Sequence, residues 1–260
     1  MTRARSSSRG RAGGDALGAE QVEGRRAVLE LLRAGAREVR KVELASTVRD
    51  DDALDEIREL AGKALKVVSP ERIDEVARTD APQGVIATAA PLRAADLDDL
   101  LAAPDAFLVA LDGVSDPRNL GAVVRVAETA GATGLILPKH RSAGITPVVT
   151  KAAAGAIEYL PIALTGGIPN ALERASRAGC WTIGLDASAE ARSLFDLELA
   201  DQPLVLVLGS EGSGLSRLSA ARCDVLVSIP MRGAIASLNV SAAAALACHE
   251  IGRRRAALRS

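Results

Sequence analysis

The most informative segment of the chain is Leu204-Val-Leu-Val-Leu-Gly-Ser-Glu-Gly-Ser-Gly-Leu-Ser216. Its first five residues are all apolar, which is typical of a strand that is buried on both faces. Glycines at 209, 212 and 214 then let the backbone turn tightly and approach a ligand closely. A buried strand that ends in such a loop before a helix is the repeating unit of a parallel sheet covered by helices.

The residues around this stretch repeat the same alternation. Short apolar runs separated by helical patterns predict further strands, and an Ala-rich helix is expected to close the chain. The sequence therefore predicts an α/β domain with a mostly parallel sheet and helices on both faces. The strands are expected at 108–112, 134–137, 159–163, 181–185, 204–208 and 225–229, and the last helix at 240–257.

The first part of the chain predicts a separate, smaller α/β unit of the order α-β-α-β-α-β. Its helices are expected at 24–34, 52–63 and 71–78, and its strands at 39–44, 65–68 and 85–89. We divide the chain into a disordered basic tail (1–19), a small domain (20–89), an acidic linker bracketed by prolines (90–105) and a large domain (106–260).

Composition favours a cytoplasmic protein with basic ends. The net charge is −1, but residues 1–49 carry 11 Lys and Arg against 6 Asp and Glu, and residues 232–260 carry 5 against 1. Such local basic surface is typical of phosphate contacts, although solvated terminal arginines are the simpler reading of charge alone. Three scattered cysteines argue against disulfides and zinc, and we expect no membrane span, signal peptide or metal.

Two further loops of the large domain combine a strand end with polar residues and a helix start. In the stretch 112–125, Asn119 stands where a helix would begin, as an N-cap, and Arg125 lies beside the buried stripe, one turn into that helix. A solvated charge paired with Glu128 is the alternative for Arg125. In the stretch 227–241, Ser237 and Asn239 either point at a ligand or cap the last helix.

The glycine loop does not have the pattern of a nucleotide-phosphate loop. Its order is G-x-x-G-x-G, and no Gly-Lys-Ser/Thr follows. Glu211 lies inside it, where a carboxylate would repel a pyrophosphate but would tolerate a cationic ligand such as a sulfonium.

In order, the three loops resemble the three motifs of the SpoU/TrmH family of RNA 2′-O-ribose methyltransferases in the SPOUT superfamily. The matching stretches are Asp116-Pro-Arg-Asn-Leu-Gly with Arg125, Leu208-Gly-Ser-Glu-Gly-Ser-Gly-Leu, and Ile229-Pro-Met with Ser237-Leu-Asn-Val-Ser. The resemblance covers residues 107–255 and extends weakly to 21–89, which looks like the RNA-binding domain of the ribosomal RNA members. It implies a trefoil knot, a bent S-adenosylmethionine as cofactor, and a homodimer with the C-terminal helix in the interface.

The resemblance also implies site residues. The cofactor is expected at Leu208, Gly209, Ser210, Gly214, Ile229, Met231, Leu238 and Asn239; the catalytic set is Arg125, Asn119, Glu211, Ser237 and Asn239; and RNA is expected at Arg25, Arg26, Arg118 and Arg125. No metal is implied.

For the chemistry, a histidine base is the usual choice, but His140 and His249 both lie outside the three loops. Arginine stays protonated, so our hypothesis is that Arg125 binds the phosphate beside the target ribose and stabilises the developing alkoxide, while the proton passes to phosphate or water. Asn119 would orient Arg125 or the ribose, and Glu211 would hold Arg125 or steer the substrate. Ser237 and Asn239 would order the knot loop and the cofactor.

The two-domain layout resembles the 23S ribosomal RNA guanosine-2′-O-methyltransferases; action on transfer RNA, or in ribosome-targeting antibiotic resistance, is the alternative. Few aromatic residues lie near the basic N-domain, so we expect no readout by base stacking. A nicotinamide-dependent oxidoreductase would need G-x-G-x-x-G after the first strand, which is not found near 114–120. A silent RNA-binding module would have lost Arg125, Glu211 or Asn239, and all three are present.

Overall fold

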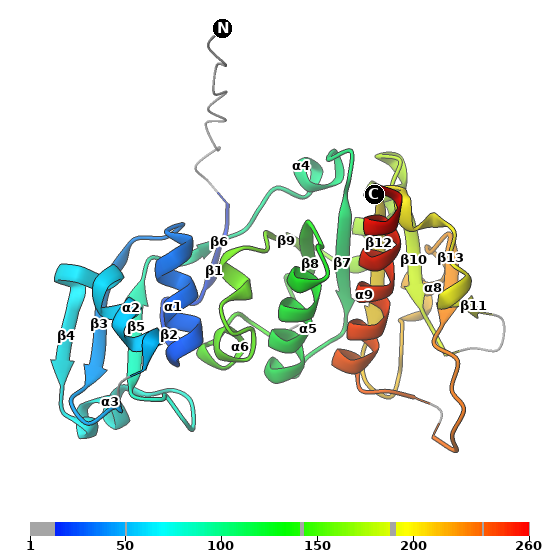
Figure 1. The fold of residues 1–260 in the computed structure, drawn as a ribbon. Helices are drawn as coiled ribbons and strands as arrows, with labels where there is room; N and C mark the ends of the chain where they lie inside the picture. Colours follow the sequence, from blue (N-terminus) through cyan, green and yellow to red (C-terminus); the bar gives the residue numbers. More distant parts are fainter. Residues whose placement is uncertain (1–13, 50, 141–142, 188–190, 236, 260) are drawn as a thin grey trace, which may run out of the picture.

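A seven-stranded, fully parallel sheet forms the core of the large domain (Figure 1). The computed structural model describes residues 14–259 except 50, 141–142, 188–190 and 236. The strand order is β11-β13-β10-β12-β7-β8-β9, so that β12 lies between β7 and β10. The strands are β7 (Phe107–Asp112), β8 (Gly134–Pro138), β9 (Ile162–Thr165), β10 (Trp181–Leu185), β11 (Arg192–Ser193), β12 (Leu204–Gly209) and β13 (Val225–Ser228).

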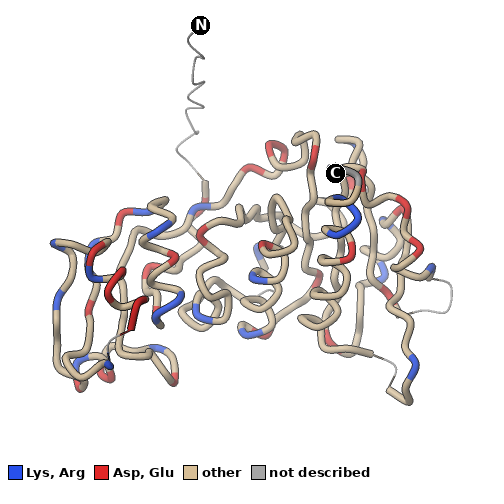
Figure 2. Tube along the Cα trace, viewed as in Figure 1, with Lys and Arg blue, Asp and Glu red and all other residues tan. Residues whose placement is uncertain are grey.

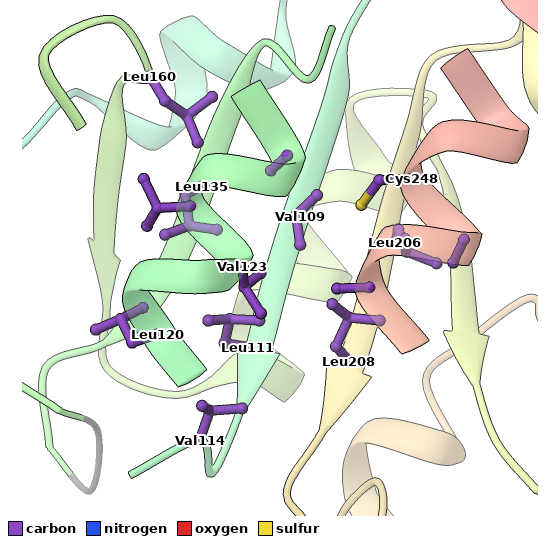
Figure 3. Close-up of a cluster of buried hydrophobic side chains, with 14 of the residues drawn as sticks. Val109, Leu111, Val114, Leu120, Val123, Leu135, Leu160, Leu206, Leu208 and Cys248 are labelled. Atoms are coloured by element: carbon purple, nitrogen blue, oxygen red, sulfur yellow. The ribbon is translucent and has the colours of Figure 1, made fainter. Parts of the chain in front are cut away.

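Helices cover both faces of this sheet, as the apolar strands predict. Alternate residues of β7 enter opposite hydrophobic clusters: Val109 and Leu111 face α5 and α9, whereas Leu108 and Ala110 face α4 and α7. Figure 3 shows the first of these clusters, in which Val123 of α5 and Cys248 of α9 pack over the strands. The helices are α4 (Leu97–Leu101), α5 (Pro117–Thr129), α6 (Pro147–Ala152), α7 (Ile168–Arg177), α8 (Arg217–Ala220) and α9 (Val240–Arg259).

The helix α9 is fastened to the sheet by a buried guanidinium. Arg255 donates hydrogen bonds to the backbone carbonyls of Ala106 and Asp105 at 2.9 and 2.8 Å, just before β7, and its guanidinium lies 5.1 Å from the ring centroid of Phe107. Carbonyls of Ala200 and Gln202 accept at 2.6 Å each. A buried cation needs such a full set of acceptors, so this arginine has a structural role.

The small domain has a four-stranded sheet of order β2-β5-β3-β4, with β3 and β4 parallel and the other pairs antiparallel. The predicted α-β-α-β-α-β order is confirmed, and an additional edge strand, β2, precedes it. The elements are β2 (Gln21–Glu23), α1 (Arg25–Ala34), β3 (Val39–Ala45), α2 (Asp52–Ala61), β4 (Leu65–Val68), α3 (Pro70–Val76) and β5 (Val85–Ala89).

Three sequence-based expectations are corrected by the structure. Within the predicted tail, residues 14–19 are ordered, because β1 (Ala16–Gly18) pairs with β6 (Leu92–Arg93) and Ala19 is buried; residues 1–13 lie outside the described part of the chain. The predicted linker contains β6 and α4, whose Leu97 and Leu101 enter the core. The strand expected at 159–163 lies at 162–165 instead, since a 3₁₀ turn (Ala156–Glu158) occupies the residues before it.

The two domains are joined by a buried ion pair. Arg37 contacts Glu158 through two hydrogen bonds, of 2.9 and 2.5 Å, and their side chains are only 5% and 1% exposed. The remaining nitrogen of Arg37 donates to the carbonyls of Ala19 and Ala90 at 2.8 Å each. At the other end of the junction, Lys151 of α6 donates to Thr79 Oγ1 at 3.1 Å. These contacts hold the small domain beside α5 and α6.

Among the described residues, no helix has the length and apolar character needed to cross a membrane. The threading of the expected trefoil knot stays a prediction.

Candidate active site

The largest concentration of predicted site residues surrounds one open cavity at the carboxyl ends of β10, β12 and β13. In a parallel sheet this edge is where ligands bind. The cavity, which we call the motif cavity, encloses about 800 Å³ including the space at its mouth. Among its lining residues are Leu208, Gly209, Ser210, Glu211, Gly214, Ile229, Met231, Ser237 and Leu238, all of which were singled out from the sequence.

The glycine loop has the tight backbone that its sequence predicts. Backbone N–H and C=O groups of Ser210 and Gly214 exchange two hydrogen bonds of 3.0 Å, and Gly212 between them has φ +83°. A Cβ atom added at Gly209 would lie 2.1 Å from the carbonyl carbon of Gly214. Only glycine therefore lets the loop fold back onto the end of β12 and form this wall of the cavity.

Side chains from all three motifs meet at the rim of the motif cavity. Asn119 of α5 donates from Nδ2 to Glu211 Oε1 at 3.0 Å. Asn239, just before α9, donates to the Oδ1 atom of Asn119 at 3.1 Å and also to Glu211. These three residues are 28 to 120 positions apart in the chain. Their network ties the loops after β7, β12 and β13 together.

The start of α5 differs from the prediction in a way that explains the network. The N-cap is Asp116, whose Oδ1 accepts from the backbone N–H groups of Arg118 and Asn119 at 2.7 and 2.9 Å. Asn119 is thus wrong as an N-cap: it lies in the first turn of the helix. Because Asp116 satisfies the backbone, the amide of Asn119 is available to Glu211.

Asn239 caps the last helix, which is one of the two tasks that the sequence left open for it. Its Oδ1 atom accepts from the backbone N–H of Ser241 at 2.9 Å, in the first turn of α9, and its Nδ2 atom reaches Glu211 and Asn119. It does not line the motif cavity, whereas its neighbours Leu238 and Val240 do. The cofactor contact expected at Asn239 is therefore not seen in the cavity wall.

Arg125 lies away from the motif cavity in the single chain. It is exposed in the third turn of α5, two turns into the helix where one was expected, and six residues from Asn119 on a helix correspond to about 9 Å along the axis. It lines a different cavity, together with Arg26 and Glu128. Within one chain, neither Asn119 nor Glu211 contacts Arg125, so the alternatives of orienting the ribose and steering the substrate stay as predictions for these two residues.

The other basic residues expected to bind RNA lie on the same junction of the domains. Arg118 is exposed and lines a third cavity with Arg78 and Lys151. Arg26 is exposed on α1, and Arg25 is half-buried in an ion pair with Asp51. Figure 2 shows basic positions on α1, α5 and α6 along the same lower side of the molecule.

Sequence reasoning missed one wall of the motif cavity. Leu185, Asp186 and Ala187 line it from the end of β10, and Ala243 lines it from α9. The strand 181–185 was predicted, so its carboxyl end beside β12 and β13 carried a usable signal. Asp186 adds a second carboxylate near Glu211, which makes the cavity suited to a cation. Within the described part of the chain, no His, Cys, Asp and Glu side chains cluster as metal ligands.

Comparison with known proteins agrees with this geometry. Residues 106–249 match the SpoU rRNA Methylase family, and residues 21–95 match the domain described as RNA 2′-O ribose methyltransferase substrate binding. The 23S rRNA (guanosine-2′-O-)-methyltransferase RlmB of Ralstonia nicotianae is 41% identical over 236 residues, covering 88% of this chain and 93% of the relative. An uncharacterized tRNA/rRNA methyltransferase of Mycobacterium avium is 40% identical, covering 91% and 78%.

Solved structures give the same result for the whole chain. The SpoU methyltransferase AviRb from Streptomyces viridochromogenes, in complex with AdoMet, superposes with a TM-score of 0.76 at 26% identity, covering 91% of this chain and 90% of that one. Both domains of the chain thus match proteins of one family. The chain belongs to the SpoU rRNA methylase family, and it is an S-adenosylmethionine-dependent RNA 2′-O-ribose methyltransferase.

Proposed function

We propose that this enzyme methylates the ribose 2′-hydroxyl of a guanosine in 23S ribosomal RNA. The RlmB relative, which has this activity by name, matches the chain across both domains. The small domain is fixed to the large one by the buried Arg37–Glu158 pair, so RNA held by one domain is presented to the other in a defined position. The observation that carries the proposal is the 41% identity to this RlmB relative over 88% of the chain. The Asn119–Glu211–Asn239 network, which joins all three motifs at one cavity, supports the methyl-transfer site itself.

The residues of the motif cavity fit S-adenosylmethionine. The close approach at Gly209 gives a backbone wall without side chains, and apolar residues such as Leu208 and Leu238 lie beside it. The carboxylates of Glu211 and Asp186 favour a positive charge nearby. When bound, the cofactor supplies an activated methyl group. Leu208, Gly209, Ser210, Gly214, Ile229, Met231 and Leu238 would hold it, and Ser237 and Asn239 would order the loop around it.

Arg125 is proposed to act in a homodimer, with Arg125 of the partner subunit at the motif cavity. Its guanidinium has no hydrogen bond or ion pair with the described residues, so it is available to bind a group in the partner subunit's site. In the segment before α9 and on α9 itself, Ile235, Leu238 and Leu246 are 72%, 38% and 43% exposed. Exposed apolar residues gathered at one place are typical of an interface. Arg125 would then bind the phosphate beside the target ribose and stabilise the developing alkoxide.

The test is a comparison of substrates. Ribose methylation is mapped across ribosomal and transfer RNA from cells with and without the gene, and the purified enzyme is given each RNA with S-adenosylmethionine. We expect one guanosine of 23S RNA to lose its methyl group without the gene and to gain it in vitro. Methylation of transfer RNA alone would contradict the assignment of the substrate. If loss of the methyl group changes only resistance to a ribosome-targeting antibiotic, the role of the enzyme would be reassigned to antibiotic resistance.

A further inference from the structure

Between the two domains lies a second cavity that the cofactor does not use. We call it the interdomain cavity; it encloses about 580 Å³ including its mouth. Helix α1 contributes Arg26 and Glu30, and α5 contributes Arg125 and Glu128. The remaining wall includes Tyr159, the single tyrosine of the chain, whose surface is 47% exposed.

The ring of Tyr159 is held in place from the small domain. Its hydroxyl donates to Glu30 Oε2 at 2.9 Å, and the other oxygen of Glu30 accepts from Arg33 at 3.0 Å. A Cβ atom added at Gly155 would lie 2.2 Å from the Cβ atom of Glu30, so the two domains approach closely here. The hydroxyl edge of the ring is thus fixed while much of the side chain stays open to the cavity. A ring that is fixed and exposed loses little conformational entropy when another ring stacks on it.

Basic side chains continue from this cavity along α5. Arg118 lies seven residues before Arg125, which is two helical turns on the same side and about 10 Å. It lines the neighbouring cavity with Arg78, and the two cavities adjoin along α6 and the residues after it. Arg78 and Arg118 are exposed, whereas Lys151 is already bonded to Thr79.

The two cavities differ in charge, so we expect them to bind different parts of an RNA strand. In the interdomain cavity, Arg26 and Arg125 are balanced by Glu30 and Glu128. A nearly neutral space with an aromatic ring suits a nucleobase. In the neighbouring cavity, three cations face only Asp80. That excess of positive charge suits the backbone phosphates.

We propose that the interdomain cavity is a subsite for an unpaired RNA base, which stacks on Tyr159 while Arg118 and Arg78 contact phosphates of the same strand. Single-stranded RNA is recognised by such a combination of aromatic rings and basic side chains. This inference rests on the proposed RNA methyl transfer and deepens it. It also revises the expectation that base stacking is absent, because Tyr159 comes from the large domain and reaches the small one only through the fold.

The experiment measures binding of three probes that share a backbone. They are a short adenosine homopolymer, a uridine homopolymer of equal length and an abasic ribose-phosphate chain. Wild type is expected to bind the adenosine chain about tenfold more tightly than the abasic one, with uridine between them. Tyr159→Leu should lose most of this preference, and Tyr159→Phe should keep it. Phe195→Leu, which changes another exposed aromatic residue outside the cavity, is the matched control.

A second readout needs no substituted variant, because it uses the tyrosine that the chain already has. Because the chain has one tyrosine, incorporated 3-fluorotyrosine gives a single fluorine resonance. The adenosine chain should shift it upfield through the stacked ring, and the abasic chain should leave it nearly unchanged. Equal binding of all three probes by wild type, an unchanged preference in Tyr159→Leu, or equal fluorine shifts would overturn the subsite. If these fail while ribosomal RNA is still methylated, only the subsite falls; if the preference is found but no ribose is methylated, the proposed function falls.

Discussion

The motif cavity and the interdomain cavity are built on opposite principles. At the rim of the first, the polar side chains are bonded to one another: Asn119, Glu211 and Asn239 form a closed network. In the second, the guanidinium of Arg125 has no hydrogen-bond partner among the described residues, and Tyr159 is half exposed. The motif cavity is therefore organised before its small ligand arrives, whereas we infer that the interdomain cavity is completed by a macromolecule.

The largest effect is expected from changing Arg125, which lines the interdomain cavity but not the motif cavity of its own chain. Arg125→Ala should lower the rate of methyl transfer by about 10²–10³-fold, because a charge aimed at the developing oxyanion is lost. Binding of S-adenosylmethionine, measured by calorimetry, should change by less than about twofold, since the residue lies outside the motif cavity in its own chain. Arg125→Lys keeps the charge but loses the planar guanidinium, so its rate of methyl transfer should lie between those of the wild type and Arg125→Ala. Full activity of Arg125→Ala would remove the proposed role.

The next largest effect is expected from a substitution that breaks the domain junction, which shapes the interdomain cavity. Glu158→Ala leaves the buried guanidinium of Arg37 without its carboxylate and should lower the free energy of unfolding by about 3 kcal/mol in urea titrations. RNA affinity should fall as well, while the cofactor affinity of the folded variant should be retained. Glu56→Ala, which removes a solvent-exposed pair with Arg33, is the control and should destabilise the fold much less than Glu158→Ala. Equal losses for the two variants would show that burial of the pair is unimportant.

A smaller effect tests the charge of the motif cavity. Glu211→Gln keeps an oxygen for the two asparagines but removes the negative charge. We expect S-adenosylmethionine to bind about tenfold more weakly, and the neutral product S-adenosylhomocysteine to bind nearly as before, because only the sulfonium carries the positive charge. The measurement is calorimetric titration with both ligands. Equal weakening of both would mean that Glu211 acts through loop structure instead of charge.

The smallest effect concerns a surface distant from both cavities. The Arg253 guanidinium, helped by Arg254, holds the pKa of Glu250 at about 2, against the effect of burial. A carboxylate with a lowered pKa stabilises the fold above its unfolded value of about 4.3, and this contribution is lost as the pH falls toward 2. Glu250→Gln should therefore lower the Tm by about 1–2 °C at pH 7, and the gap should close between pH 4.3 and 2. A gap that does not vary with pH would contradict the assignment.

The sequence predicted the sheet and the motif cavity because both depend on local patterns. Apolar runs such as 204–208 mark buried strands wherever they lie, and the glycines of the loop mark a close backbone approach. Strand β1 was missed because three residues pair with a two-residue strand far along the chain, which leaves no periodic signal. Asn119 was misplaced because Asp116 and Asn119 are both good N-caps, and only the structure shows which one the helix uses.

Contacts between distant segments could not be predicted in the same way. The position of Arg125 relative to the motif cavity depends on which side of α5 faces α6 and the small domain, and the helical pattern gives only the buried stripe. The role of Tyr159 depends on Glu30, 129 residues away, and on a domain junction that no motif describes.

Mixing two inactive variants shows whether the motif cavity of one subunit works with Arg125 of the partner subunit. Arg125→Ala and Gly209→Val each remove one part of the site, and doubly tagged heterodimers of the two are purified and assayed for methyl transfer. We expect about half the wild-type rate, because one of the two sites then combines an intact cavity with an intact arginine. Heterodimers as inactive as the two parent variants would contradict it.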